Sequence, residues 1–346
     1  MTEESGKFIE IPTIAITYPR VDRDYPISER ENLMRALNHE KPLWMPDVTS
    51  TGQHAPLDGY GDTAASRSSD SSDWFGVQYK FSAAQGTNTP IAGAFSEIGE
   101  WKEKIKWPIF DTWDWEKGCE DFVRDESLAL YSRLSFGLFE RLHAFVGFEQ
   151  ALIDLILEPE ECGAFFERLA DHKIEMVKRL NDIYHYDFVY YHDDWGTARA
   201  PFFSTDLFEQ TLFEPTKRVI KAMREEGIKV VFHNCGLVED FIPYLVDEIK
   251  ADGLQIQPLN DLKSILQKYG NRITLDHNSP DKKLLYDPKT TPEEARAYAR
   301  EFVDTFGAHN NPGAGVIVTS YALNEDVFYA FGEEIFQYSL EKYKSL

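Results

Sequence analysis

The stretch Lys229-Val230-Val231-Phe232-His233-Asn234-Cys235-Gly236 is an apolar, β-branched run that ends in polar residues and a glycine. A short apolar run of this kind is typical of a strand buried on both faces of a parallel sheet. Similar runs, each ending in polar residues, occur at 189–194, 253–257, 273–278 and 316–320. Helical patterns follow these runs at 205–226, 237–250, 262–269, 291–306 and 324–343. Strand then helix, five times over, predicts an α/β fold, and we expect a (β/α)8 TIM barrel.

The first half of the chain is less regular. Residues 1–27 contain three prolines and little periodicity, which indicates an N-terminal extended arm. Ser28 and Glu31 form a capping pair that opens a helical pattern, and residues 42–48 have the character of a first buried strand. Residues 49–72 are rich in Ser, Gly, Asp and Thr, and a loop of that length is either functional or disordered. We predict a single barrel domain over 28–346, preceded by the arm.

The charge balance excludes some classes of partner. Lys and Arg number 36 against 59 Asp and Glu, for a net charge of −23, so the surface field repels nucleic acids and anionic lipids. No apolar run approaches the roughly 18 residues that a membrane helix needs, and the start of the chain is acidic where a leader peptide would be basic. The three cysteines are widely spaced, which fits a reducing compartment. We expect a cytoplasmic protein that binds neither nucleic acid nor membrane.

His233 and Cys235 lie two positions apart at the end of one predicted strand, so both side chains face the same way. An imidazole and a thiolate on one face suit Zn²⁺ better than Mg²⁺ or Ca²⁺. The alternative for such a pair is a buried histidine beside a small core cysteine. Because a TIM barrel carries its active site at the carboxyl ends of its strands, we predict that His233 and Cys235 bind zinc there.

Other polar residues fall at the same ends of neighbouring strands. Asp193 and Asp194 are adjacent, so one is expected to face the barrel mouth while the other caps the following turn. His192 would point with Asp194, and an Asx turn before Gly196 is the alternative. The residues that we take as candidate acids and bases are Asp194, His192, Asp276 and His277. Three residues at or after strand ends are taken as substrate contacts, two of them aromatic and able to wall a pocket: Trp195, Gln257 and Tyr321.

Several segments, taken in order, resemble the uroporphyrinogen decarboxylase superfamily. They are 30–42, 73–77, 137–140 with 147–149, 193–196 and 233–236. The resemblance extends from about Ser28 to the C-terminus, and it implies a (β/α)8 barrel. It also adds Glu140 and Glu149 to the expected substrate contacts.

Two branches of this superfamily differ in chemistry. The decarboxylases carry an Arg-Gln-Ala-Gly-Arg-Tyr segment that holds the carboxylates of the porphyrinogen, whereas residues 47–52 contain no arginine. The other branch is similar to methylcobamide:coenzyme M methyltransferases and to the methyltransferases of corrinoid-dependent O-demethylase systems. It carries a His-x-Cys zinc motif, which His233 and Cys235 match. In the coenzyme M enzymes a further cysteine near the last strand completes the site, but residues 318–321 have none, which leaves Glu149, Asp276 and Ser320 as candidates for the third ligand.

The resemblance implies a methyltransferase that moves a methyl group from a small methylated substrate, an aryl methyl ether, to the Co(I) corrinoid of a partner protein. The chain has no Asp-x-His-x-x-Gly cobalamin-binding segment, so the corrinoid is expected on a separate protein. An ether oxygen is a poor leaving group, and a metal or an acid is expected to activate it. The alternatives are a decarboxylase of a small acid and a non-catalytic protein that binds a corrinoid or an aromatic molecule.

Overall fold

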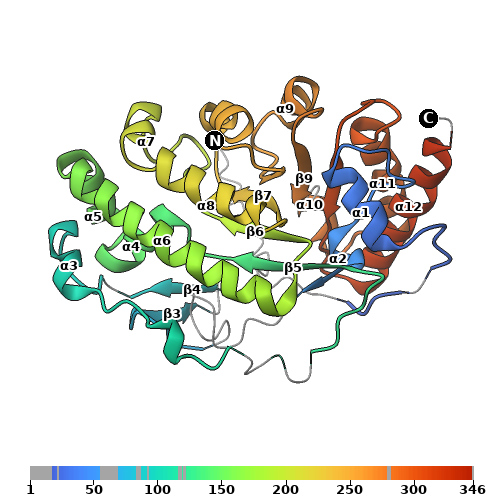
Figure 1. Cartoon of the computed structure of the whole chain (residues 1–346). Coiled ribbons are helices and arrows are strands. Elements are labelled where there is room, and N and C mark those ends of the chain that lie inside the picture. The colour runs from blue at the N-terminus through green and yellow to red at the C-terminus, as the bar shows by residue number, and fades with distance from the viewer. Residues whose placement is uncertain are drawn as a thin grey trace, which may run out of the picture.

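The computed structural model describes residues 18–21, 23–54, 69–82, 87–91, 93–115, 119, 122–278 and 282–344. Within these residues, seven parallel strands form one sheet in the order β1-β5-β6-β7-β8-β9-β10. They are β1 (Gly52–His54), β5 (Ala129–Leu134), β6 (Phe188–His192), β7 (Lys229–Asn234), β8 (Gly253–Ile256), β9 (Thr274–Asn278) and β10 (Val316–Thr319). The sheet curls, and helices cover its outer face (Figure 1). The predicted α/β class is therefore confirmed.

The helices follow the strands much as the sequence pattern predicts. They are α1 (Glu29–Leu37), α2 (Val48–Thr51), α3 (Trp101–Lys104), α4 (Leu138–Val146), α5 (Phe148–Leu157), α6 (Pro159–Tyr184), α7 (Thr205–Thr211), α8 (Phe213–Glu225), α9 (Leu262–Tyr269), α10 (Lys282–Leu285), α11 (Pro292–Phe306) and α12 (Glu325–Tyr343), with short turns η1 (Ile98–Glu100) and η2 (Phe110–Thr112). The helix predicted over 237–250 is present, but it is shorter and irregular. A 3-10 turn, η3 (Glu239–Phe241), continues through Ile242 and Pro243, which both have right-handed helical dihedrals, into a π-helix, η4 (Tyr244–Glu248).

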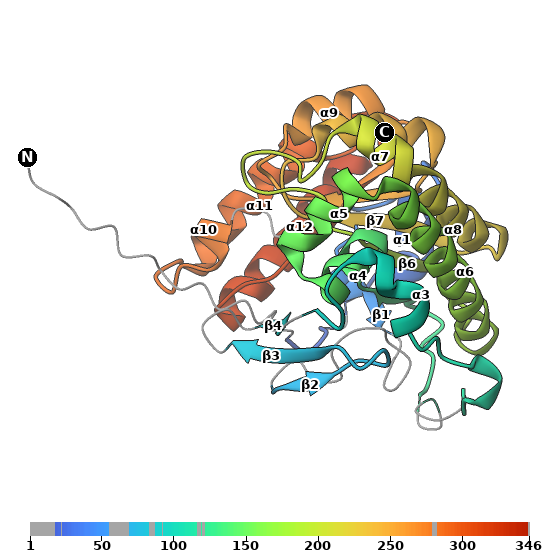
Figure 2. The same cartoon turned by 90° about the vertical axis from the view of Figure 1, so that its left-hand side faces the viewer.

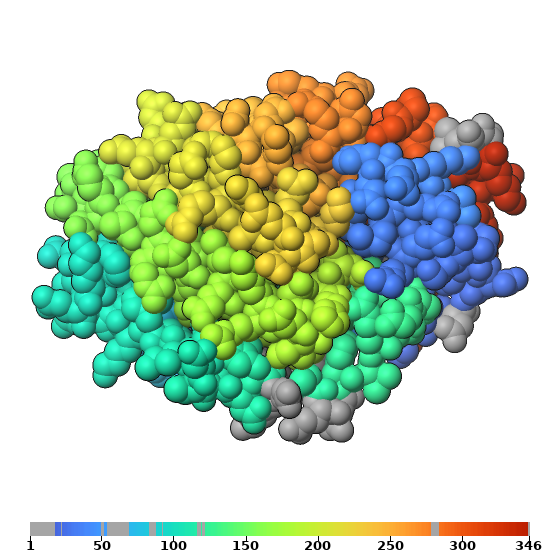
Figure 3. All heavy atoms as spheres, viewed as in Figure 1, coloured from blue at the N-terminus to red at the C-terminus, as the bar shows by residue number. Residues whose placement is uncertain are grey.

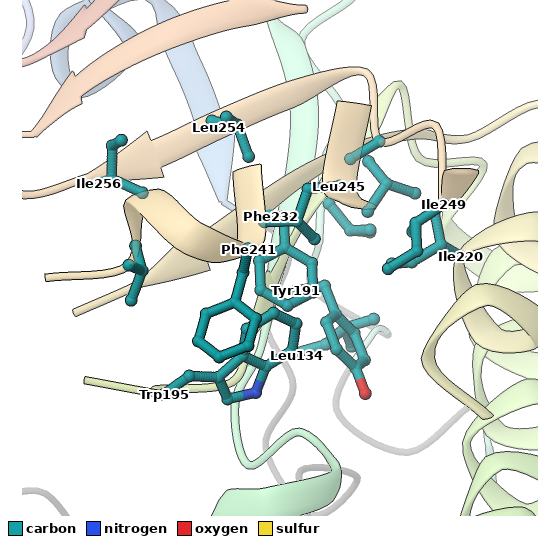
Figure 4. Packing of buried hydrophobic residues seen from close by; sticks show 14 of the residues in the cluster. Leu134, Tyr191, Trp195, Ile220, Phe232, Phe241, Leu245, Ile249, Leu254 and Ile256 are labelled. Carbon is teal, nitrogen blue, oxygen red and sulfur yellow. The ribbon is translucent and has the colours of Figure 1, made fainter. Parts of the chain in front are cut away.

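The two faces of the curled sheet bury different clusters. The inner face packs against α1, where the Thr274 hydroxyl donates to the carbonyl of Ala36 over 2.8 Å. The outer face packs against the surrounding helices and carries the larger apolar cluster. Figure 4 shows part of it, with Phe232 of β7 beside Trp195 and Phe241. In the space-filling view, residues of both halves of the chain form one continuous surface on this side of the molecule (Figure 3).

The two edges of the sheet meet at a seam. Asp47 forms a parallel bridge with Val318 of β10, and the Val318 N–H donates to the carbonyl of Pro46 over 2.9 Å. The chain then passes through α2 into β1, which pairs with β5. The strand predicted over 42–48 is thus reduced to a single bridge. Because seven strands are present in the described residues, the count of eight stays a prediction.

A small antiparallel sheet lies beside the main sheet. It consists of β2 (Ser71–Ser72), β3 (Gln78–Ser82) and β4 (Thr87–Pro90), and Figure 2 shows it at one side of the molecule. The buried carboxylate of Asp73 accepts hydrogen bonds from the N–H groups of Phe75 and Val77, both over 3.0 Å. It also forms a fully buried ion pair with Arg141 of α4. This ion pair connects the small sheet to the helix that borders the site described below. Residues 55–68 of the predicted 49–72 loop lie outside the described residues.

The described part of the N-terminal arm lies against α12. Tyr18 donates its hydroxyl to the carbonyl of Leu323 over 2.8 Å, and the Arg23 guanidinium pairs with Glu333 at 2.7 Å. The predicted boundary between arm and barrel at residue 27 stays a prediction. Among the helices of the described residues, none has the length and apolar character that crossing a bilayer requires.

Candidate active site

Three donor side chains converge at the carboxyl ends of β6 and β7. The Nε2 atom of His233 lies 3.3 Å from the Sγ atom of Cys235 and 3.7 Å from the Oδ1 atom of Asp194. The three ligand atoms all lie within 4.8 Å of one another. His233 is buried, while Asp194 and Cys235 are partly exposed, so the cluster opens on one side. We call these three residues the donor triad.

The donor triad fits the dimensions of a zinc site. The ligand atoms of a tetrahedral zinc lie roughly 3.3–3.6 Å apart, given metal–ligand bonds of about 2.0–2.3 Å. The measured separations from His233 to Cys235 and Asp194 are close to this range. One imidazole, one thiolate and one carboxylate also form the mixed donor set that zinc accepts, and three protein ligands leave a position open for a substrate. The structure therefore brings Asp194 to a position where it could be a third ligand beside His233 and Cys235.

The candidates named from sequence for that third position lie elsewhere. Glu149 is exposed in the first turn of α5. Ser320 donates its hydroxyl to Asp47 at the seam of the sheet. Asp276 is fully buried inside the curl of the sheet and is engaged by other polar groups.

A chain of hydrogen bonds sets the tautomer of His233. The Nδ1 atom of His233 lies 2.6 Å from Oε1 of Gln255, whose Nε2 group donates to Asp276 over 2.6 Å. Because an ionised Asp276 only accepts hydrogen bonds, the Gln255 amide turns its oxygen toward the histidine, and Nδ1 must donate. Nε2 then presents a lone pair to the other two donors. This is the supporting arrangement that fixes histidine ligands in metal sites.

The residues between the ligands hold the two loops together. The side-chain oxygen of Asn234 accepts from the N–H of Trp195 over 3.0 Å. The Cys235 N–H donates to Asp194 over 2.7 Å, which fixes this carboxylate beside the thiol. Gly236 has φ +88°, and a Cβ atom there would lie 2.2 Å from the backbone of Gly196. The His-Asn-Cys-Gly motif thus combines two donors with the two residues that let the loops approach each other.

The adjacent carboxylates of Asp193 and Asp194 have different roles. Asp193 is fully buried and accepts from the N–H groups of Leu138, Phe139 and Glu140 at 3.0–3.2 Å, so it caps the N-terminus of α4. The sequence predicted that one of the two carboxylates caps the turn that follows them. Asp193 does cap an element, but that element is α4, which comes earlier in the chain. Burial raises the pKa of Asp193 to about 6, although the backbone N–H groups act in the opposite direction. Asp194 is the partner that faces the mouth.

Two titratable residues of α4 border the same opening. Burial, with the nearby carboxylates of Asp194 and Asp193, raises the pKa of Glu140 well above its ordinary value. Burial lowers the pKa of His143, one turn further along, to about 4. At neutral pH His143 is therefore uncharged, and the environment of Glu140 favours its protonated form.

The floor of the site is a network of polar side chains inside the sheet. Asp276 accepts from the hydroxyls of Tyr190 over 2.6 Å and Thr319 over 3.0 Å, besides the amide of Gln255. Burial raises the pKa of Asp276 to about 6 against the lowering effect of these hydrogen bonds. The Arg133 guanidinium lies over the Tyr190 ring, 4.5 Å from its centroid, and donates to the Tyr321 hydroxyl over 3.2 Å.

Of the remaining residues that the sequence predicted for the site, some lie beside the donor triad and others do not. His192 stacks on His233 with ring centroids 3.9 Å apart, and the Gln257 amide oxygen accepts from the Gly236 N–H over 3.1 Å, so both lie beside the donor triad. Trp195 is fully buried in the outer cluster against Phe232, and its ring does not line the mouth as predicted (Figure 4).

His277 is not an acid or base of this site. Its ring packs against Phe302 and Phe306 of α11, and burial lowers its pKa to about 3. The physical reason is the alternation of the strand, since Asp276 faces inward and its neighbour must face the helices.

Sequence reasoning missed Arg133, Tyr190 and Gln255. Each lies on the inner face of its strand, and two of them had a visible signal in the sequence. Arg133 is a charged residue within the apolar run of β5, and Gln255 shares a strand face with Gln257, which is two positions away.

A parallel α/β sheet with its polar cluster at the carboxyl ends of the strands is the arrangement of many barrel enzymes. Comparison with known families makes the assignment more specific. Residues 140–328, more than half of the chain, match the family model described as uroporphyrinogen decarboxylase (URO-D), and the chain belongs to this family.

Comparison with solved structures finds one that shares the fold at low sequence identity and others that match weakly. A methyltransferase from Methanosarcina mazei has a TM-score of 0.63 and 10% identity over 89% of this chain and 98% of that one. A chitinase from Chromobacterium violaceum has a TM-score of 0.32 and 11% identity over 61% of this chain and 81% of that one. No curated protein sequence matches the chain.

Proposed function

We propose that this protein transfers a methyl group from a small aryl methyl ether to the Co(I) corrinoid of a separate partner protein. The observation that carries the proposal is the donor triad of Asp194, His233 and Cys235 at the open end of a URO-D fold. The absence of arginine from residues 47–52, where the decarboxylases hold their substrate, supports it as well. The fold that the chain shares with a methanogen methyltransferase is consistent with this reaction.

The reaction needs three things from the protein. The bond between the methyl carbon and the ether oxygen breaks, the methyl carbon bonds to the cobalt of the partner, and the oxygen keeps the electron pair and takes up a proton. A zinc ion held by the donor triad would supply Lewis acidity at the ether oxygen. The protein must also orient the ring so that the methyl group faces the opening, and it must provide the proton.

We assign the proton to Glu140. It lies at the first turn of α4, where it interacts with Asp194 of the donor triad. Asp276 lies inside the sheet, but Tyr190, Gln255 and Thr319 already surround its carboxylate. Glu140 is thus the carboxyl group that a substrate in the mouth can reach.

The test is methyl transfer by the purified protein to a reduced corrinoid protein, with a panel of methoxylated aromatics and zinc content measured on the same samples. We expect a methyl-Co(III) absorption band with at least one substrate and one zinc per chain. Cys235→Ser should lose both, whereas Cys119→Ser, which changes a cysteine outside the donor triad, should keep both. If no substrate gives the band with a zinc-loaded protein, the methyltransferase proposal is wrong.

One observation favours a second candidate, a decarboxylase of a small acid. Arg133 places a positive charge inside the sheet, as a carboxylate substrate requires. Release of CO2 by metal-free protein that is unaffected by Cys235→Ser would support this candidate over methyl transfer.

A further inference from the structure

Arg133 lies on the inner face of β5, and aromatic rings surround its side chain. Its guanidinium carbon is 4.5 Å from the centroid of the Tyr190 ring and 5.9 Å from that of Tyr131. The Tyr321 hydroxyl, which follows β10 across the seam, accepts a hydrogen bond from it over 3.2 Å. The residue as a whole is partly exposed.

No carboxylate of the described residues forms an ion pair with Arg133. The nearest acid that influences it, Asp276, is engaged by the hydroxyl of Tyr190 and the amide of Gln255. The contrast with Arg141 is clear, because that arginine is fully buried and pairs with Asp73. The rings of Tyr131 and Tyr190 and the hydroxyl of Tyr321 hold the cation instead, so a ligand carboxylate would not have to displace a protein carboxylate from it.

We propose that Arg133 binds a carboxylate of the substrate, so that the methyl donor is an aromatic acid rather than a neutral or cationic molecule. A guanidinium offers two parallel N–H groups to a carboxylate, which fixes the plane of the ligand as well as its position. The rings of Tyr131, Tyr190 and Tyr321 would flank a flat aromatic body. A quaternary ammonium donor would be repelled by the same charge.

The placement of Arg133 also suits the donor triad. β6 lies between β5 and β7, and Arg133 is in register with Tyr190 and Val231. His233 is therefore two strand spacings away and two residues further along β7, roughly 11–12 Å at the backbone. Tyr190, under the Arg133 guanidinium, and His192, stacked on His233, lie between the two residues on β6, so a flat ligand would lie against their rings. The carboxylate would lie on Arg133, and the methoxy group would lie toward the donor triad. This inference rests on the proposed function for the identity of the methoxy group, but not for the anion.

Equilibrium binding tests the inference without the corrinoid protein. Calorimetric titration would compare 4-methoxybenzoate with the uncharged 4-methoxybenzamide on the wild type and on Arg133→Gln. We expect the wild type to bind the acid about tenfold or more tightly than the amide, and Arg133→Gln to lose this preference without weakening the amide. The matched control is Arg168→Gln, because Arg168 also lies over an aromatic ring, 4.1 Å from the centroid of Trp107, but on α6. This variant should bind like the wild type.

Each outcome distinguishes the two proposals. Equal binding of acid and amide by the wild type, or an acid preference that survives in Arg133→Gln, overturns the carboxylate subsite even if methyl transfer is observed. Binding of the acid through Arg133 without methyl transfer to any corrinoid protein keeps the subsite and removes the proposed function. If Arg133→Gln does not fold, Arg133→Lys keeps the charge but not the paired N–H groups. It should weaken acid binding while amide binding is unchanged, and an unaltered acid affinity would also count against the subsite.

Discussion

His277 carries an unfavourable polar group into the outer core. It is 4% exposed, and its Nδ1 atom has no hydrogen-bond partner among the described residues. Burial holds its pKa near 3, below the ordinary value of 6.5. Below about pH 6.5 the imidazole of His277 is protonated in the unfolded chain, whereas in the folded protein it is protonated only below about pH 3. Acid therefore destabilises the fold through this residue, by about 1.4 kcal/mol for each pH unit within that window.

We predict that His277→Leu makes the protein more resistant to acid. The free energy of unfolding of the variant, relative to the wild type, should rise as the pH falls from about 6 to 4, because the variant has no imidazole to protonate on unfolding. Urea denaturation at several pH values measures the difference. His185→Asn, at an exposed histidine that also has a positive φ, should show the pH dependence of the wild type. If the free energies of unfolding of His277→Leu and the wild type differed by the same amount at about pH 6 and about pH 4, the lowered pKa of His277 would be contradicted.

At the scale of elements, the N-terminus of α4 depends on close contact with the loop after β6. A Cβ atom added to Gly137 would lie 2.2 Å from the Cβ atom of Asp193, the residue that caps this helix. Gly163 lies within α6, and a Cβ atom there would meet nothing within 4 Å. The same substitution should therefore have opposite effects at the two glycines.

We predict that Gly137→Ala lowers the free energy of unfolding by about 1–3 kcal/mol, as overpacking does. The added methyl group would occupy the space that the capping side chain of Asp193 already fills. Gly163→Ala should raise it by roughly 0.5–1 kcal/mol through helix propensity. Denaturant titration of both variants measures the two changes. If Gly137→Ala were as stable as the wild type, the contact between α4 and Asp193 would have to be looser than the structure has it.

The elements also show what the sequence can predict. β6 to β10 contain apolar runs because both faces of these strands are buried. Such runs can be recognised in the sequence. β1 is a three-residue strand of Gly, Gln and His, defined by its hydrogen bonds to β5, and these leave no apolar signal. Alternation placed His233 and Cys235 on one face, but it does not tell which face is the inner one. For that reason Asp276 and His277 were both taken as candidates, although adjacent residues of a strand face opposite ways.

At the scale of the whole molecule, the net charge of −23 attracts cations everywhere on the surface. Binding of zinc alone is thus weak evidence for a site. A site made by the donor triad differs from the acidic surface in two respects. It depends on a single thiol, and screening by salt at about 0.15 M weakens the exposed carboxylates much more than a partly buried imidazole and thiolate.

We predict that zinc stabilises the folded protein in about 0.15 M salt and that this stabilisation requires Cys235. At a free zinc concentration about 1,000 times the dissociation constant, linkage adds roughly 4 kcal/mol, which for a chain of this length raises the Tm by about 5 °C. Scanning calorimetry with zinc and with a chelator measures the difference. Cys235→Ser should lose it, and Cys119→Ser should retain it. An equal rise in Tm for both variants would assign the zinc to the acidic surface, since neither thiol would then matter, and the donor triad would be a polar cluster without a metal.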